Sequence, residues 1–465
     1  MQNITNYDSH CHLFTGKETI NLRLLFEIIF GFPKEQEKDK AAQKTLAAKE
    51  NIFERVRGKI QMLRRILNFL KTGFSGSEED ILAKMESSYG VSFKVAPLMF
   101  DLECVFVAER TGGSVDFMSH QNLIVAEYQR IVDELHASNK SFIQEAMIII
   151  SGMKMADRLN HDHGDLAELQ KLSKELEAEL DLFKDEKMAS QNLMVSLVTN
   201  YDIQLKDISQ LKATHPDDVY PFIAIDPRRE GIIDKFINEI YAENIFCGVK
   251  LYAPNGYSPA DTDLMKPGGL YDFCVQHNIP ITAHHSFGGF ATPLGSVEID
   301  GLIYDNGVKE VHGPVSLSKA FSTGWVQERA TKFNHPDIWE KVMEKYPTLK
   351  LNLAHFGNGN ADWQKKIYSM IGNPKYPNMH TDLSCWCNLN DPSKDEIGLQ
   401  SFYDMYYKNA SDYVKSKILY GSDFYLDLLY TDSLNIYLGN FNRVFPDKEF
   451  TRIAFTNAKK FLNLK

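Results

Sequence analysis

Ile4-Thr5-Asn6-Tyr7-Asp8-Ser9-His10-Cys11-His12 is the stretch of sequence that decides the fold. It is predicted to be a short β-strand that ends in a His-x-His pair. Side chains alternate across a strand, so His10 and His12 point to the same face, about 6.6 Å apart along the strand. Two imidazoles on one face can bind the same metal ion. A polar strand end would show the same pattern, so the interpretation depends on how the later strands end.

The composition is that of a globular protein. The chain has 465 residues, 43% hydrophobic and 24% charged, enough for one large barrel with insertions or for two to three ordinary domains. A net charge of -11 with no basic domain argues against a nucleic-acid partner. We expect neither a signal peptide nor a membrane span. Six cysteines do not form a disulfide scaffold and favour a reducing, cytoplasmic location.

Strands and helices alternate along most of the chain. The predicted strands are 4–12, 93–101, 220–226, 246–252, 279–285, 349–355, 378–384 and 417–423, and the helices between them include 229–242, 269–277, 336–346, 363–371 and 402–410. A long glycine-rich loop is predicted from Ser286 to His335. Eight such units favour parallel pairing in a closed (β/α)8 TIM barrel. No glycine fingerprint for a dinucleotide follows any strand, which argues against a doubly wound sheet.

Two large helical insertions interrupt the pattern, at about 17–90 and 102–215. Their predicted helices are 18–32, 38–70, one that begins after Ser77, 115–137, 142–159, 166–183 and 201–213. Both insertions leave the carboxyl ends of strands, so we expect a helical cap over the active-site mouth of one barrel that spans residues 1–465.

Chemically capable side chains gather where strands end, which is where a TIM barrel places its catalytic groups. They are His10, His12, Lys250, His284, His285, His355 and Asp423. Each alone has an ordinary alternative: a core histidine, a helix cap or a surface lysine. Together they predict a metal site. His284 and His285 are adjacent and face opposite sides, so only one of them should reach the barrel axis.

Two further motifs are weaker. His161-Asp162-His163 lies between helical patterns beside Gly164, so we interpret it as a loop or helix cap and not as a metal site. Cys385-Trp386-Cys387 has no second cysteine pair nearby and is interpreted as small buried residues on a strand.

Five segments resemble the signature strands of the amidohydrolase superfamily, in the branch that also contains metal-dependent decarboxylases. They are His10-Cys11-His12, Gly248-Val249-Lys250-Leu251, Ile279-Pro280-Ile281-Thr282-Ala283-His284, Leu353-Ala354-His355-Phe356-Gly357 and Tyr420-Gly421-Ser422-Asp423-Phe424. The tail Thr456-Asn457-Ala458-Lys459-Lys460-Phe461-Leu462 is similar to that branch's closing helix. The resemblance covers nearly the whole barrel but neither insertion, and it says little about the substrate.

The resemblance implies that His10, His12, His284 and Asp423 bind a divalent metal. Three imidazoles and one carboxylate suit Zn²⁺, with Mn²⁺ or Fe²⁺ as alternatives, and one metal is favoured over two. His355 would stand beside a single metal as a catalytic group, or would bind a second metal.

The expected chemistry follows from the ion. Bound Zn²⁺ lowers the pKa of water to about 7, so that hydroxide is available at neutral pH. Asp423 would hold the metal or take the proton from the attacking water, and His355 would polarise the carbonyl or stabilise the oxyanion. The resulting hypothesis is a hydrolase that cleaves a C–N or C–O bond of a small molecule.

Several points stay open in the sequence. In some superfamily members the lysine that matches Lys250 is carbamylated and bridges two metals; otherwise Lys250 would anchor a substrate carboxylate. A non-oxidative decarboxylase would use the same ligands. Arg228 could clamp a substrate carboxylate, although a salt bridge at a helix start is the other interpretation, while His285 and His312 are further candidates for substrate binding. The sequence leaves open a homo-oligomer.

Overall fold

The computed structural model describes residues 5–15, 52–73, 77–101, 103–109, 137, 140, 163–189, 201–320, 322–386 and 395–464. The chain divides into two compact units. One contains residues 1–19, 75–115 and 199–465, and the other contains 20–74 and 116–198. The predicted helices 18–32, 115–137 and 142–159 lie outside the described residues, apart from Ala137. In the described part of the chain, no helix is long and apolar enough to cross a membrane.

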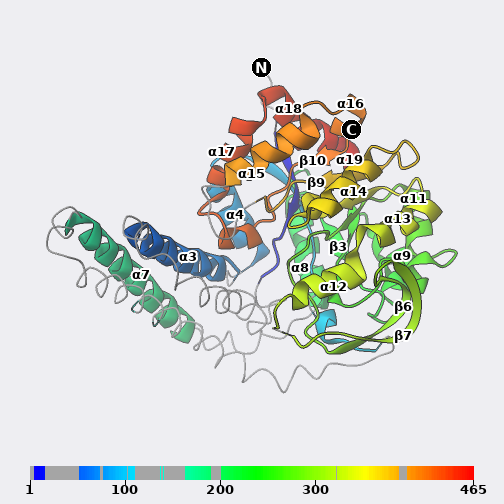
Figure 1. The fold of residues 1–465 in the computed structure, drawn as a ribbon, viewed down its shortest axis with the longest axis horizontal. Coiled ribbons are helices and arrows are strands. Elements are labelled where there is room, and N and C mark those ends of the chain that lie inside the picture. Colours follow the sequence, from blue (N-terminus) through cyan, green and yellow to red (C-terminus); the bar gives the residue numbers. More distant parts are fainter. Residues whose placement is uncertain are drawn as a thin grey trace. The chain divides into compact units, whose positions relative to one another are not determined.

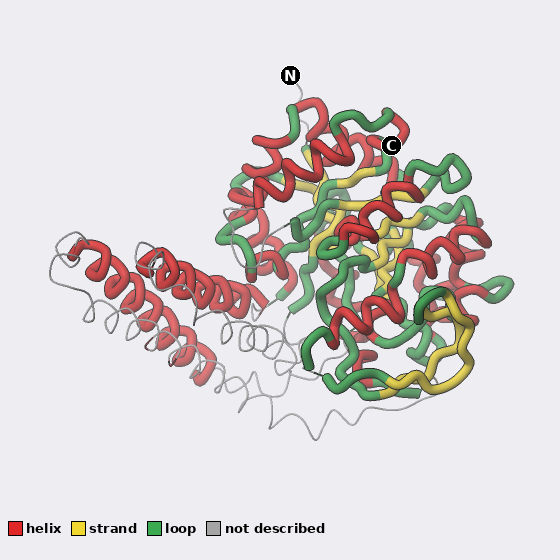
Figure 2. Tube along the Cα trace, in the orientation of Figure 1, coloured by secondary structure: helices red, strands yellow, loops and turns green. Residues whose placement is uncertain are grey.

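Eight short parallel strands form the centre of the first unit (Figures 1 and 2). They are β1 (Asn6–Cys11), β2 (Phe93–Pro97), β3 (Phe222–Ala224), β4 (Gly248–Leu251), β5 (Ile281–Ala283), β8 (Leu351–Leu353), β9 (Met379–Asp382) and β10 (Ile418–Leu419). Regular pairing links β1 to β2 and joins the other six in the order β10-β9-β8-β5-β4-β3. Each strand matches one of the predicted strands.

Hydrogen bonds outside the regular pairing join these two sheets into a ring. Bridges connect Val95 to Val219 and Leu98 to Phe222, between β2 and β3. On the other side, Ser9 N donates to Tyr420 O at 3.0 Å and Ser422 N donates to His10 O at 3.1 Å. The prediction of a (β/α)8 barrel is therefore confirmed, with the insertions after its first and second strands.

Helices surround the strands (Figure 2). They are α4 (Glu78–Tyr89), α8 (Tyr201–Thr214), α9 (Ile232–Asn238), α10 (Thr262–Met265), α11 (Leu270–His277), α12 (Trp325–Asn334), α13 (Pro336–Lys345), α14 (Ala361–Ile371), α15 (Asp395–Phe402), α16 (Asp412–Lys415), α17 (Leu434–Val444), α18 (Asp447–Thr451) and α19 (Asn457–Phe461). The positions where they begin and end agree with capping residues in the sequence. Ser77 caps α4 as predicted, because its side chain accepts a hydrogen bond from Asp80 N, and Gly90 ends the helix in the left-handed region.

An apolar core packs against the strands of the barrel. Leu98 just after β2, Phe222 of β3 and Leu419 of β10 pack with Phe461 and Leu462 of the closing segment, and all five are buried. Burying a side chain of this size contributes about 1.5–3 kcal/mol.

The prediction of an irregular loop from Ser286 to His335 is wrong. The segment contains an antiparallel hairpin, β6 (Ser296–Tyr304) and β7 (Val308–Ser316), followed by α12 (Figure 1). Val297, Ile299 and Ile303 alternate with more exposed residues along β6, and Asn306-Gly307 turns the chain with positive φ angles. Alternation followed by Asn-Gly is a hairpin signal that the glycine-rich composition obscured.

The second unit contains two helices in its described part. In α3 (Ile52–Gly73) and α7 (His163–Ala189), buried leucines such as Leu63, Leu67 and Leu176 face inward, and the two helices pack together. Arg64 contacts Glu175 and Glu179 at 3.2 Å each. That the insertions cap the active site stays a prediction.

Asp8 helps to close the barrel ring. Its Oδ1 accepts hydrogen bonds from His10 N at 3.2 Å and Ser422 N at 3.0 Å, while Tyr89 of α4 donates its hydroxyl to Oδ2 at 2.6 Å. Asp8 is completely buried, and this burial raises the pKa of its carboxyl to about 6 despite the hydrogen bonds. An ionised Asp8 therefore opposes folding.

We expect Asp8→Asn to stabilise the protein at pH 8. Because the pKa of Asp8 is higher in the folded than in the unfolded chain, the free energy of unfolding falls as pH rises from about 4 to 6, by on the order of 1–3 kcal/mol. An asparagine can keep all the hydrogen bonds, since its amide would donate to the Tyr89 hydroxyl. Urea unfolding of metal-depleted protein at pH 4.5 and 8 should show a larger gain at pH 8; equal gains would contradict this account.

Candidate metal centre

The carboxyl ends of four strands bring four histidines and one aspartate together. His10 lies in β1 and His12 just after it, and His284, His355 and Asp423 follow β5, β8 and β10. All five side chains are buried. His355 and Asp423 have φ angles of 62° and 69°, a left-handed conformation that costs non-glycine residues about 1–3 kcal/mol each. Such strain persists only where the surrounding structure holds it in place.

The inward atoms of these residues are close together. Asp423 Oδ1 lies 3.2 Å from His10 Nε2 and 3.1 Å from His12 Nε2. His284 Nδ1 lies 3.2 Å from His355 Nε2. His10, His355 and Asp423 each offer one ligand atom, and these three atoms lie within 4.8 Å of one another. Residues from the beginning and from the end of the sequence thus meet in one cluster.

The outer nitrogen of each imidazole faces an oxygen atom. His10 Nδ1 lies 3.0 Å from Asp382 Oδ2, His12 Nδ1 2.9 Å from Leu98 O, His284 Nε2 3.1 Å from Gly288 O, and His355 Nδ1 3.2 Å from Ser384 O. Carbonyl and carboxylate oxygens only accept hydrogen bonds, so this network assigns the proton of each neutral imidazole to its outer nitrogen. The inner nitrogen of each ring is then a bare lone pair.

Five lone-pair atoms therefore form close pairs, and those that make one compact group of potential ligands among the described residues belong to His10, His355 and Asp423. The five atoms are the inner nitrogens of the four histidines and Asp423 Oδ1, and among the described residues His10 Nε2 is buried without a hydrogen-bond partner. Ligands about 2.1 Å from a metal ion lie roughly 3.0–3.5 Å from one another, which matches the separations of 3.1 and 3.2 Å. The residues thus fit a divalent metal.

The electrostatics of the cluster also favour a cation. Burial would raise the pKa of Asp423, but the neighbouring imidazoles of His10, His12 and His355 hold it well below its ordinary value. Burial and Lys250 lower the pKa of His10, yet Asp382 and Asp423 together raise it above its ordinary value. Burial lowers the pKa of His12 and, to about 4, that of His355. Most of the imidazoles are therefore neutral at pH 7, as metal binding requires.

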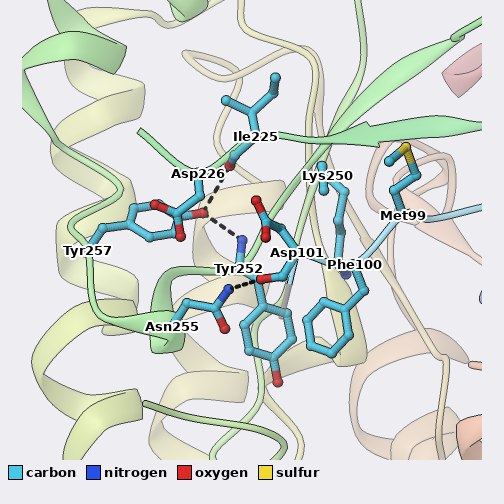
Figure 3. A pocket seen from close by; sticks show the side chains of 10 residues that line it. Met99, Phe100, Asp101, Ile225, Asp226, Lys250, Tyr252, Asn255 and Tyr257 are labelled. Atoms are coloured by element: carbon cyan, nitrogen blue, oxygen red, sulfur yellow. Dashed lines mark hydrogen bonds between the residues drawn. The ribbon is translucent and has the colours of Figure 1, made fainter. Parts of the chain in front are cut away.

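Lys250 lies near the end of β4, beside this cluster. It is buried, and its ammonium lies 5.9 Å from the centre of the Tyr252 ring. Figure 3 shows that it lines a small pocket with Phe100, Asp101 and Tyr252. Burial lowers the pKa of Lys250 to about 8, although Asp423 and Asp382 act in the opposite direction. Among the described residues, no carboxylate lies within ion-pair distance of this ammonium.

The other predicted substrate-binding residues lie elsewhere. Arg228 forms a buried ion pair with Asp226 at 2.7 Å, which is the salt bridge that we gave as the alternative role. His285 turns away from His284 and packs its ring 4.9 Å from that of Trp363. His312 lies on β7, 61% exposed, with Asp300 and Glu310 as its partners. The structure does not bring these three side chains into the cluster.

Sequence reasoning missed three buried polar residues behind the cluster: Asn352, Asp382 and Ser384. Asp382 accepts hydrogen bonds from His10 and Asn352, and Ser384 Oγ lies 3.0 Å from His10 Nδ1 and 2.9 Å from His355 Nδ1. A carboxylate at the end of a predicted strand was the available signal for Asp382, the same signal that indicated Asp423.

The amidohydrolase family model matches residues 205–464, more than half of the chain. No curated protein matches the chain. Solved structures with a similar fold include an uncharacterised TIM-barrel protein from Bordetella bronchiseptica, at 17% identity and a TM-score of 0.35 over 56% of this chain and 71% of that one.

The other matches include enzymes. The 5-carboxyvanillate decarboxylase from Sphingomonas paucimobilis is 10% identical, with a TM-score of 0.34 over 57% of this chain and 72% of that one. The dihydroorotase from Campylobacter jejuni is 14% identical, with a TM-score of 0.30 over 56% and 71%. These likenesses are too distant to carry an inference about chemistry.

Proposed function

Because the chain belongs to the amidohydrolase family, we propose that it is a metal-dependent hydrolase that cleaves a C–N or C–O bond of a small molecule. The observation that carries the proposal is the group formed by His10, His355 and Asp423 at the strand ends. His12 and His284 adjoin it, at 3.1 Å from Asp423 and 3.2 Å from His355. Such a cluster both holds a metal and leaves bases to accept a proton.

In this proposal His10, His12, His284 and Asp423 hold one divalent metal. Histidines and one carboxylate suit Zn²⁺, and Mn²⁺ and Fe²⁺ are the alternatives. When bound, such a metal lowers the pKa of water and polarises a carbonyl group. His355 completes the cluster, since it offers one atom within 4.8 Å of those offered by His10 and Asp423.

The protein's own groups would move the protons. Asp423 is ionised, so it can accept the proton of the attacking water. The Nδ1–H of His355 donates to Ser384 O, so Nε2 of the ring can accept another proton. His355 can then take the proton that Asp423 received from water and pass it to the leaving nitrogen or oxygen. Water then adds to the carbonyl carbon, the C–N or C–O bond breaks, and the leaving group departs protonated.

Lys250 would bind a carboxylate of the substrate. A buried ammonium without an acidic partner costs several kcal/mol, and an anionic substrate would offset that cost. Lys250 is such a group, because it is buried and no carboxylate among the described residues lies within ion-pair distance of it. The other role is carbamylation, which would make Lys250 a bridge between two metals.

A decarboxylase is the second candidate, and Lys250 is the observation that favours it. Loss of CO₂ leaves a carbanion that must gain a proton. The inward atoms of the histidines and Asp423 are acceptors, whereas the Lys250 ammonium is a donor. It could protonate the carbon after CO₂ leaves.

The two reactions are separated by isotopes. Metal-loaded protein is incubated with a panel of esters, lactones, amides and aromatic carboxylic acids in ¹⁸O-labelled water or in D₂O. The hydrolase proposal expects ¹⁸O in a product carboxylate and no CO₂. Release of CO₂, with deuterium on the product carbon and no ¹⁸O incorporation, would replace it with the decarboxylase.

A further inference from the structure

We propose that Asp382 is a positioning residue that fixes His10 as a metal ligand and His355 as a proton acceptor. The inference rests on the proposed metal site and concerns the atoms behind it. Asp382 is the last residue of β9 and is completely buried.

Both oxygens of Asp382 receive hydrogen bonds. Oδ2 faces His10 Nδ1 at 3.0 Å and accepts from Asn352 Nδ2 at 2.7 Å. Oδ1 accepts from the backbone nitrogens of His355 at 2.9 Å and Ser384 at 3.0 Å, and also from the Ser384 hydroxyl. Only an ionised carboxylate can accept on both sides.

One consequence concerns the proton of His10. Because Oδ2 is an acceptor, it keeps a hydrogen on Nδ1 of the neutral ring and leaves Nε2 bare toward Asp423. A carboxylate that hydrogen-bonds the outer nitrogen of a ligand histidine fixes its tautomer and raises its basicity. Asp382 therefore prepares His10 to bind a cation.

The second consequence concerns His355. Oδ1 holds the backbone nitrogen of this residue, whose φ of 62° is in the left-handed region. Oδ1 also accepts a hydrogen bond from the backbone nitrogen of Ser384. The carbonyl and hydroxyl oxygens of Ser384 in turn lie within hydrogen-bond distance of His355 Nδ1. A single carboxylate thus orients both rings.

Asp382→Asn should disturb this arrangement in a particular way. The new amide has one acceptor and one donor, and the backbone nitrogens of His355 and Ser384 cannot become acceptors. The amide oxygen must stay with them, so the NH₂ group faces His10 Nδ1. The ring then moves its proton to Nε2, where it blocks the metal position.

Asp8→Asn provides a matched control. Asp8 is equally buried and also accepts a bond from His10, but from its backbone nitrogen. Its second oxygen faces the hydroxyl of Tyr89, which can accept as well as donate. The same change therefore leaves the His10 tautomer as it is.

The test is a Co²⁺ titration of metal-depleted full-length protein, followed by visible absorption and by competition with a chelator. We expect Asp382→Asn to weaken Co²⁺ binding by about 10–100-fold and to change the absorption bands of the bound ion. Asp8→Asn should bind within about twofold of wild type. Asp382→Ala should lose less affinity than Asp382→Asn, because water can accept from His10 in the vacated space.

The outcomes separate this inference from the proposed function. If the wild-type protein binds no Co²⁺, the metal site itself is wrong. If the wild type binds and Asp382→Asn binds equally well with the same spectrum, the positioning role is overturned. A larger loss in Asp382→Ala than in Asp382→Asn would show a merely structural role. If circular dichroism shows that Asp382→Asn does not fold, the Co²⁺ affinity of Asp382→Ala is the test. An Asp382→Ala variant that binds Co²⁺ as tightly as the wild type would overturn the inference.

Discussion

Replacing His10 and His12 together by alanine is expected to lower metal affinity by roughly 10⁴-fold. Sites with four protein ligands bind Zn²⁺ with about 10–16 kcal/mol, or roughly 3 kcal/mol per ligand, so two ligands account for about 6 kcal/mol. The double variant should emerge from purification without metal when the wild type retains at least one equivalent, as measured by elemental analysis.

The control for this experiment is the second His-x-His motif. His163 begins α7 in the other unit, and His161 and Asp162 lie outside the described residues. His161→Ala with His163→Ala should leave the metal content unchanged. Full occupancy in the His10 and His12 double variant, or loss of one equivalent in the control, would show that the metal lies elsewhere.

The second large effect is expected at Asp423. Asp423→Asn keeps the size of the side chain and one oxygen toward His10 and His12, but removes the charge and most of the basicity. If Asp423 accepts the proton of water, kcat should fall by about 10²–10⁴-fold while much of the metal stays bound.

The measurement is kcat and metal content side by side, on a substrate from the isotope panel. His312→Ala is a matched control, because His312 lies exposed on the hairpin and pairs with Asp300. It should keep the wild-type rate. Wild-type turnover in Asp423→Asn would remove Asp423 from the mechanism and leave His355 as the candidate for proton transfer.

The sequence predicted the barrel because the alternation of strands and helices is a local signal. Residues 246–252 are a mostly buried apolar run that contains Lys250, and such runs occur where helices cover both faces of a sheet. The polar residues at the strand ends then indicated His355 and Asp423 as members of one site. The geometry places both in the cluster.

Other features depend on contacts that a local pattern does not contain. The role of Asp382 arises because β1, β8 and β9 bring His10, Asn352 and His355 around it. His285 is next to His284, yet the alternation of the strand turns it toward Trp363. The hairpin from Ser296 to Ser316 had a local signal in Asn306-Gly307, which the interpretation as a loop overlooked.

The closure of the ring between β1 and β10 has a consequence for how the protein is made. The hydrogen bond from Ser422 N to Asp8 joins residues 414 positions apart. At about 5–20 residues per second, His10 and His12 leave the ribosome roughly 20–80 s before Asp423 is synthesised. During that time Cys11 stands between them in a chain whose barrel has not yet closed, and thiolate with imidazole attracts soft ions such as Cu(I). In the finished barrel Cys11 is completely buried. The order of synthesis therefore makes correct metal loading a late event, which follows the placement of the last strand.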